Sequence, residues 1–132
     1  RDARYLHFGR ASARLDDLAN WIPARLTAIL LLLAAGLVRG RLTGMLRGWR
    51  VLVRDGGKHA SPNSGRPEAA MAGALGLRLG GINYYDGVAY DHAVIGDGRG
   101  DLTRMDIGQA TQLMVLATLL GVMIGAGVLW LQ

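Results

Sequence analysis

Residues 113–131 carry no charged side chain, and this run restricts the possible folds more than any other feature of the chain. At about 1.5 Å per residue, a helix of this length crosses a hydrocarbon layer of roughly 30 Å. The chain is 51% hydrophobic and contains 20 glycines, which is too apolar and too glycine-rich for an ordinary soluble domain of this length. The run therefore predicts a transmembrane helix over residues 113–131.

A second apolar run, residues 26–38, is short for a membrane span. It reaches spanning length when the preceding residues are included and Arg25 lies at an interface. Trp21 and Trp130 stand near the ends of the two runs, where indole rings would meet the lipid headgroups. We therefore predict a second transmembrane helix within residues 18–38.

Residues 39–112, between the two predicted spans, form a loop region that we expect on the cytoplasmic side. Seven Lys or Arg residues between positions 39 and 66 stand against one aspartate. Positive charge beside a spanning helix usually remains on the cytoplasmic side. Nucleic acid is disfavoured as a partner, because Trp49 is the only aromatic residue of this stretch that could stack on bases.

The basic stretch also has a helical pattern. Apolar residues between positions 42 and 53 recur at helical spacing, whereas Arg47, Arg50 and Arg54 gather on another face. This pattern is typical of a helix lying in a membrane surface. We interpret the three arginines as a solvated face beside anionic lipid rather than as a phosphate site.

The rest of the loop region predicts a helix, a polar loop and a helix start. Pro67 and Glu68 suit the first turn of a helix that ends at Gly80-Gly81 and carries small residues along one side. A helix side lined by small residues more often marks close helix packing than contact with a ligand. Residues 82–106 show no strand alternation, and the capping-box pattern at 103–106 predicts that the last helix starts by Arg104.

Together these patterns predict an all-α integral membrane protein: transmembrane helices, an in-plane amphipathic helix and a polar cytoplasmic loop region.

The segment from Lys58 to Gly73 is the leading candidate site, because it holds the only lysine, the only glutamate and two of the three prolines of the chain. Lys58, Arg66 and the backbone donors of a helix N-terminus could hold a phosphate or carboxylate, and Glu68 could bind Mg²⁺ or take a proton from an amine. The same residues also suit ordinary turns and helix caps. From these residues alone, a binding site and a purely structural turn are about equally supported. Cysteine, the phosphate-loop motif and the zinc-protease motif are absent.

The run H-A-S-P-N-S-G-R-P-E-A-A-M-A-G-A-L-G-L-R-L-G-G at residues 59–81 resembles the signature of the CobD/CbiB family, the integral membrane adenosylcobinamide-phosphate synthases of cobalamin biosynthesis. The resemblance extends to residues 13–18, 21–27, 83–85 and 95–98. Family members are longer, so we expect residues 1–132 to be the carboxy-terminal portion of a multi-pass protein of the inner cell membrane, with its active loop facing the cytoplasm. The piece is not expected to be active alone.

The resemblance implies an ATP- and Mg²⁺-dependent acid–amine ligase that joins aminopropanol or its phosphate to the carboxylate of adenosylcobyric acid. Other cobalamin-pathway enzymes are candidate partners. The alternative is a noncatalytic membrane subunit, either a permease component or a scaffold. The expected catalytic residues are Lys58, His59 and Glu68, with Glu68 also the candidate magnesium ligand. The expected substrate-binding residues are Ser61, Asn63, Arg66, Tyr84 and Tyr85, and the second-rank candidates, for which mutual ion pairing is the alternative, are Asp16, Asp17 and Arg25.

Overall fold

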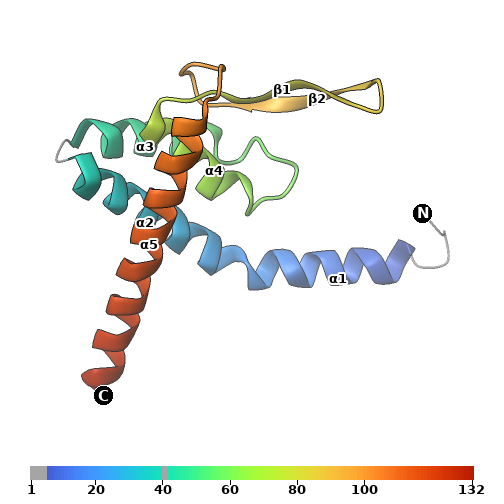
Figure 1. Ribbon diagram of the computed structural model, residues 1–132. Helices are drawn as coiled ribbons and strands as arrows, with labels where there is room; N and C mark the ends of the chain where they lie inside the picture. Colours follow the sequence, from blue (N-terminus) through green and yellow to red (C-terminus); the bar gives the residue numbers. More distant parts are fainter. Residues whose placement is uncertain (1–5, 40–41) are drawn as a thin grey trace.

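The computed structural model describes residues 6–39 and 42–132, which are mostly helical (Figure 1). The elements follow the chain in the order α1 (Leu6–Ala19), α2 (Trp21–Arg39), α3 (Leu42–Asp55), α4 (Gly65–Leu75), β1 (Leu79–Tyr85), β2 (Val88–Ile95) and α5 (Arg104–Trp130). Helix α1 reaches away from the rest of the molecule, as does the carboxy-terminal half of α5 (Figure 1). The segment from Lys58 to Gly73, called the motif segment below, consists of the loop between α3 and α4 (the motif loop) and most of α4, and α4 contacts α2, α3, α5 and β2.

Two helices, α2 and α5, are long and apolar enough to cross a membrane. This agrees with the two predicted spans. Helix α5 starts at Arg104, as predicted, and a capping box holds its first turn. The backbone N–H and the hydroxyl of Thr103 each donate to Asp106 Oδ2 at 2.7 Å. The hydrophobic span of α5 thus continues from a polar, capped beginning.

Small residues hold the helices close together. Ala34, Ala35 and Ala74 are almost fully buried where α2, α4 and α5 meet. Helices α3 and α4 cross closely: a Cβ atom on Gly73 would lie 2.7 Å from the Cα atom of Gly48. The small-residue side of α4 is therefore a packing surface, the commoner of the two predicted reasons for it.

The prediction of an all-α fold was wrong for residues 79–95, which form an antiparallel hairpin. Asp86 and Gly87 connect its strands with φ angles of 51° and 78°, the left-handed conformations of a tight two-residue hairpin turn. Nearly all of β2 is exposed, so no buried face imposes the alternation by which a strand is recognised. The Asp-Gly pair between tyrosine and valine was the signal that could have revealed the hairpin.

Helix α4 is also shorter than predicted. It ends at Leu75, where Gly76 adopts the left-handed conformation (φ 70°) and its N–H bonds to the last turn. Gly80 and Gly81 therefore belong to β1 rather than to a helix end. A glycine is suited to this cap because the conformation strains residues that carry a Cβ atom.

Two of the three arginines of α3 bond to other groups of the protein. Arg47 Nε donates to the carbonyl of Gly73 at 2.7 Å and its Nη2 to that of Ala74 at 3.2 Å. Arg54 binds acidic side chains, and only Arg50 is simply exposed. Arg47 and Arg54 are therefore exposed but also bonded within the protein, while their contact with lipid and the position of α3 relative to a membrane stay predictions.

Candidate functional site

The loop between α3 and α4 is shaped by its own polar side chains. His59 Nδ1 accepts a hydrogen bond from the backbone N–H of Ser61 at 3.0 Å. Ser61 Oγ in turn accepts from the N–H groups of Asn63 and Ser64 at 3.3 and 3.4 Å. With Nδ1 as an acceptor, the neutral His59 ring carries its proton on Nε2. Ser61 thus has a turn-forming role, and His59 Nε2, which has no partner among the described residues, is available for a ligand.

Asn63 ties the loop to the first two helices. Its side chain is buried, and Nδ2 donates to the carbonyl of Asp17 at 2.7 Å. Arg25 Nη1 donates to Asn63 Oδ1 at 3.4 Å, and the guanidinium lies 3.9 Å from the centre of the Trp21 ring. Three predicted site residues therefore meet here, but their polar groups satisfy each other.

The second-rank aspartates do not form the ion pairs considered for them. Asp16 accepts a side-chain bond from Asn20 at 3.0 Å, and Asp17 contributes its backbone carbonyl to Asn63. Arg25 contacts Asn63 and Trp21 rather than either carboxylate within the described ranges. The alternative of mutual ion pairing was wrong, because Asn63 occupies the position between α1 and α2.

Asp55, the last residue of α3, is the most heavily bonded side chain near the motif. Its carboxylate is fully buried and accepts from Arg54 Nε and Nη2 at 2.8 and 2.6 Å. Lys58 Nζ lies 2.7 Å from Oδ1, and the N–H of Gly96 lies 2.8 Å from Oδ2. These donors, the Arg54 guanidinium foremost, hold the pKa of the Asp55 carboxyl well below its usual range although burial by itself would raise it.

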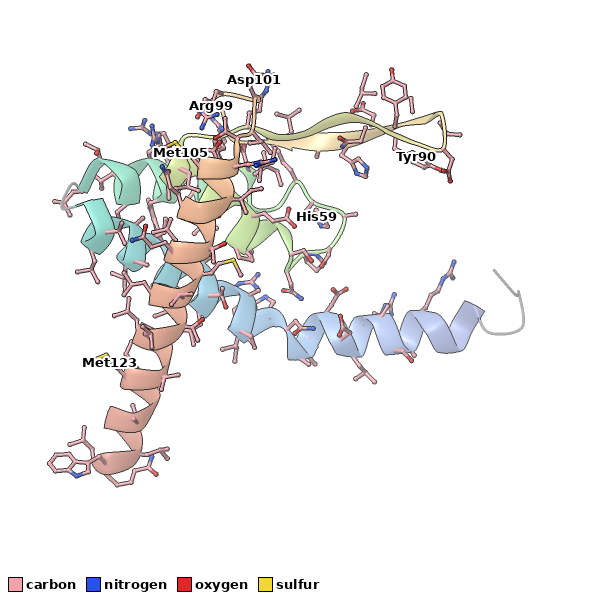
Figure 2. All side chains as sticks on the ribbon, viewed as in Figure 1. His59, Tyr90, Arg99, Asp101, Met105 and Met123 are labelled. Carbon is pink, nitrogen blue, oxygen red and sulfur yellow. The ribbon has the colours of Figure 1, made fainter. Side chains whose placement is uncertain are left out.

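A polar cavity of about 430 Å³ lies between this loop and the hairpin. Lys58, His59 and Glu68 border it from the motif side, and Asn83, Asp91 and His92 are among the hairpin residues that border it. Figure 2 shows His59 on the loop beneath the hairpin, whereas Tyr90 lies toward the distal end of the strands. The cavity brings the three expected catalytic residues together.

A second cavity, about 570 Å³ and largely apolar, lies between α2, α4 and α5. Glu68 and Leu79 line both cavities. The Glu68 side chain is half-buried, and the described ranges give its carboxylate no hydrogen-bond or ion-pair partner. The only glutamate of the chain is thus an uncommitted carboxylate at the boundary between a polar and an apolar cavity.

Arg66 and Tyr84, two further expected substrate-binding residues, do not line either cavity. Arg66 is half-buried on the side of α4 that faces α3, with its Nε atom buried and unpartnered in the described part of the chain. Tyr84 is 73% exposed on β1. The side chain of Tyr85 lies outside the described residues, although its backbone pairs with Val88.

Residues 6–39 and 42–132 contain no group of three or more potential ligands from His, Cys, Asp and Glu. Mg²⁺ carried by a phosphate substrate needs only one or two protein carboxylates. Glu68 and Asp91 border the same polar cavity and fit this requirement.

Sequence reasoning missed Asp55 and the hairpin residues of the cavity. Asp55 is the single aspartate among the seven basic residues of positions 39–66, and that isolation was the available signal. Asn83 lies in the run 83–85 that shares the family resemblance, but no signal in the sequence placed Asn83, Asp91 or His92 at a cavity, because only the hairpin brings them opposite the motif loop.

Comparisons with known proteins agree on one family. A family model described as CobD/Cbib protein matches residues 1–114. The cobalamin biosynthesis protein CobD of Geobacter metallireducens is 60% identical over 98 residues, which cover 74% of this chain and 30% of that protein. CobD of Yersinia enterocolitica is 45% identical over 124 residues (93% and 38%), and the cobalamin biosynthesis protein CbiB of Salmonella typhimurium is 46% identical over 120 residues (89% and 36%). The chain spans about a third of the length of these relatives, and no solved structure matches it.

Proposed function

The chain belongs to the CobD/CbiB family, and we propose that it is part of a membrane ligase of cobalamin biosynthesis. The proposed reaction joins the amine of aminopropanol or aminopropanol phosphate to the carboxylate of adenosylcobyric acid, with ATP activating the acid. The names of the relatives support a role in cobalamin biosynthesis. The specific amide ligation is our proposal.

The observation that carries the proposal is the uncommitted Glu68 carboxylate beside Lys58 and His59 in one cavity. Amide synthesis requires an activated acyl group, cations to offset phosphate charge and a base that frees the amine. Lys58 offers an ammonium at the cavity edge, and His59 offers its Nε2 edge. Glu68 offers the base, so two of the three requirements, the cation and the base, have candidates in this cavity, while ATP would supply the activated acyl group.

In the proposed reaction, the amine nitrogen forms a bond to the activated carbonyl carbon, and the leaving group departs with the electrons of the carbon–oxygen bond. Glu68 takes the proton that the nitrogen loses. We assign the base role to Glu68 because its carboxylate borders the cavity and has no hydrogen-bond or ion-pair partner among the described residues, so its oxygens are open to accept a proton. Bound Mg²⁺ would supply positive charge against phosphate, and Asp91 is the cavity carboxylate left to hold it.

We further propose that the protein is a multi-pass protein of the inner cell membrane. Helices α2 and α5 support membrane insertion by their length and composition. The excess of basic residues between positions 39 and 66 supports a cytoplasmic position for the motif loop. Such a position would give the polar cavity access to ATP.

The test uses the full-length parent protein in membrane vesicles, supplied with adenosylcobyric acid, ATP, Mg²⁺ and either aminopropanol or its phosphate. We expect mass spectrometry to detect the amide product, and omission of ATP or of the amine to abolish it. Correctly inserted protein that binds the corrinoid but forms no amide under these conditions would instead support the noncatalytic subunit.

A further inference from the structure

We propose that Asp55 is a positioning residue that acts through Lys58, setting the ammonium at the edge of the polar cavity and fastening the hairpin wall opposite it. An effect of Asp55 on amide formation rests on the proposed ligase function. The geometric part of the proposal does not, because it concerns only the contacts of Asp55, Lys58 and the hairpin.

The exposure of the two side chains differs in a way that suits this role. Asp55 is completely buried, whereas the Lys58 side chain is 47% exposed. Of the three N–H donors of an ammonium, one bonds to Asp55 Oδ1 at 2.7 Å and one to the carbonyl of Val94 at 3.4 Å. One donor of Lys58 is left for an anionic group in the cavity. Asp55 thereby holds the Lys58 ammonium from the protein interior, while the exposed part of the side chain faces solvent at the cavity.

The same carboxylate fixes the end of β2. The N–H of Gly96 donates to Asp55 Oδ2 at 2.8 Å, across 41 positions of sequence. Gly96 has φ of 85°, and a Cβ atom there would lie 2.2 Å from the carbonyl oxygen of Leu77. Glycine at this position therefore lets the chain approach closely enough for the bond. Because the carbonyl of Val94 also accepts from Lys58, one buried anion links the loop and the hairpin that border the cavity.

Charge neutralisation alone does not require Lys58. Arg54 already binds both oxygens of Asp55, and its Nη1 continues to Asp97 at 2.7 Å on the exposed side. A buried ion pair is weak evidence for stability, because desolvation of the charges offsets much of their attraction. The additional bond from Asp55 to Lys58 holds a second cation at the edge of the cavity. A positioning role for Asp55 explains why this bond is present.

The first test measures the contact without any assay of activity. Lys58 is the only lysine of residues 1–132, so in the full-length protein an acylated lysine in a peptide from this segment can only be Lys58, and mass spectrometry can follow its acylation by an amine-reactive reagent. Asp55→Asn removes the anion that holds the ammonium, and we expect the Lys58 acylation rate to rise about threefold or more. Asp97→Asn is the matched control, because Asp97 bonds to Arg54 from the exposed side, and it should leave the rate unchanged. An unchanged rate in Asp55→Asn would overturn the proposal.

The second test is a double-mutant cycle on amide formation with Asp55→Asn, Lys58→Gln and the double variant. If Asp55 acts through Lys58, each single change should lower kcat at least about tenfold, as expected for a lost charged hydrogen bond, and the double variant should be no slower than the worse single variant. Multiplicative losses would mean that Asp55 only supports the fold, which overturns the positioning role. Because Asp55→Asn could also reduce folding, rates are normalised to inserted, folded protein, and Lys58→Gln, which removes only a half-exposed partner, supplies an independent reference.

The two tests separate this proposal from the proposed function. A parent protein that never forms the amide contradicts the ligase, while the acylation measurement still decides whether Asp55 holds Lys58. An active ligase with unchanged acylation and multiplicative losses contradicts only the positioning role.

Discussion

Gly48 of α3 and Gly73 of α4 face each other so closely that a Cβ atom on Gly73 would lie 2.7 Å from the Cα atom of Gly48. The same added atom would lie 2.9 Å from the carbonyl oxygen of Arg47. Both neighbours are backbone atoms of a helix and cannot rotate aside. The crossing therefore fixes α3, and with it Asp55, against the helix that carries Glu68.

Gly73→Ala should destabilise the full-length protein by about 1 to 3 kcal/mol, because the new methyl group forces the two backbones apart. Thermal unfolding in detergent micelles measures the change. Gly108→Ala is the matched control: Gly108 is also helical, but a Cβ atom there has no neighbour within 4 Å in the described structure. This control should be neutral or slightly stabilising through helix propensity. Equal effects of the two changes would contradict the close crossing.

Arg47 and Arg50 lie on the same helix but should differ in importance. Arg47→Gln removes the guanidinium that bonds to two carbonyls at the end of α4, at an expected cost of about 1.5 kcal/mol. Arg50→Gln should leave the unfolding temperature unchanged, because Arg50 is exposed. Thermal unfolding of both variants provides the comparison. If the two arginines served only anionic lipid, their replacement would have similar effects.

Asn63→Asp should loosen the attachment of the motif loop to α1 and α2. The substitution replaces the Nδ2 donor, 2.7 Å from the Asp17 carbonyl, by an oxygen that cannot donate. We expect a loss of about 1 to 3 kcal/mol of unfolding free energy. Asn83→Asp is the control, since Asn83 is exposed and makes only a 3.4 Å contact within its own strand. Unchanged stability of Asn63→Asp would show that the contact contributes little.

Acid should weaken the attachment of the hairpin through Asp55. The pKa of this carboxyl in the folded protein lies below its ordinary value of 3.8, so the folded state binds fewer protons than the unfolded state in that range. Its contribution to stability is present above about pH 4 and is lost as the pH falls toward the folded pKa. Unfolding measured from about pH 6 to about pH 3 should show this loss in the wild type and less of it in Asp55→Asn. Identical pH profiles would assign the acid sensitivity to other groups.

Glu68→Gln should lower kcat for amide formation by about 10²- to 10⁴-fold, because the amide side chain keeps the shape of Glu68 but cannot take a proton. Corrinoid binding and membrane insertion should change little. Asp86→Asn is a suitable control, since Asp86 is exposed in the hairpin turn with φ of 51°, a conformation that asparagine accepts. A normal kcat in Glu68→Gln would remove Glu68 from the proposed mechanism.

The parts of the fold that could be predicted are those that nearby residues decide. Residues 113–131 indicate a span because hydropathy accumulates along one helix, and Thr103 and Asp106 cap that helix across a single turn. The hairpin was missed because exposed strands lose the alternation that burial imposes, although Asp86-Gly87 carried a local signal. For the site, the motif segment was found by its rare residues, and Lys58, His59 and Glu68 do border one cavity.

The sequence by itself determined the two apolar helices, the capped start of α5 and the family, since hydropathy, caps and an ordered motif are written in consecutive residues. Only the tertiary structure decided which polar groups bond to each other over long sequence separations. Asp55 binds Gly96 across 41 positions, and Asn63 binds Asp17 across 46, so neither bond follows from local spacing. These bonds matter because a buried polar or charged group without a hydrogen-bond partner costs free energy, and its partner can come from any segment that the fold brings close.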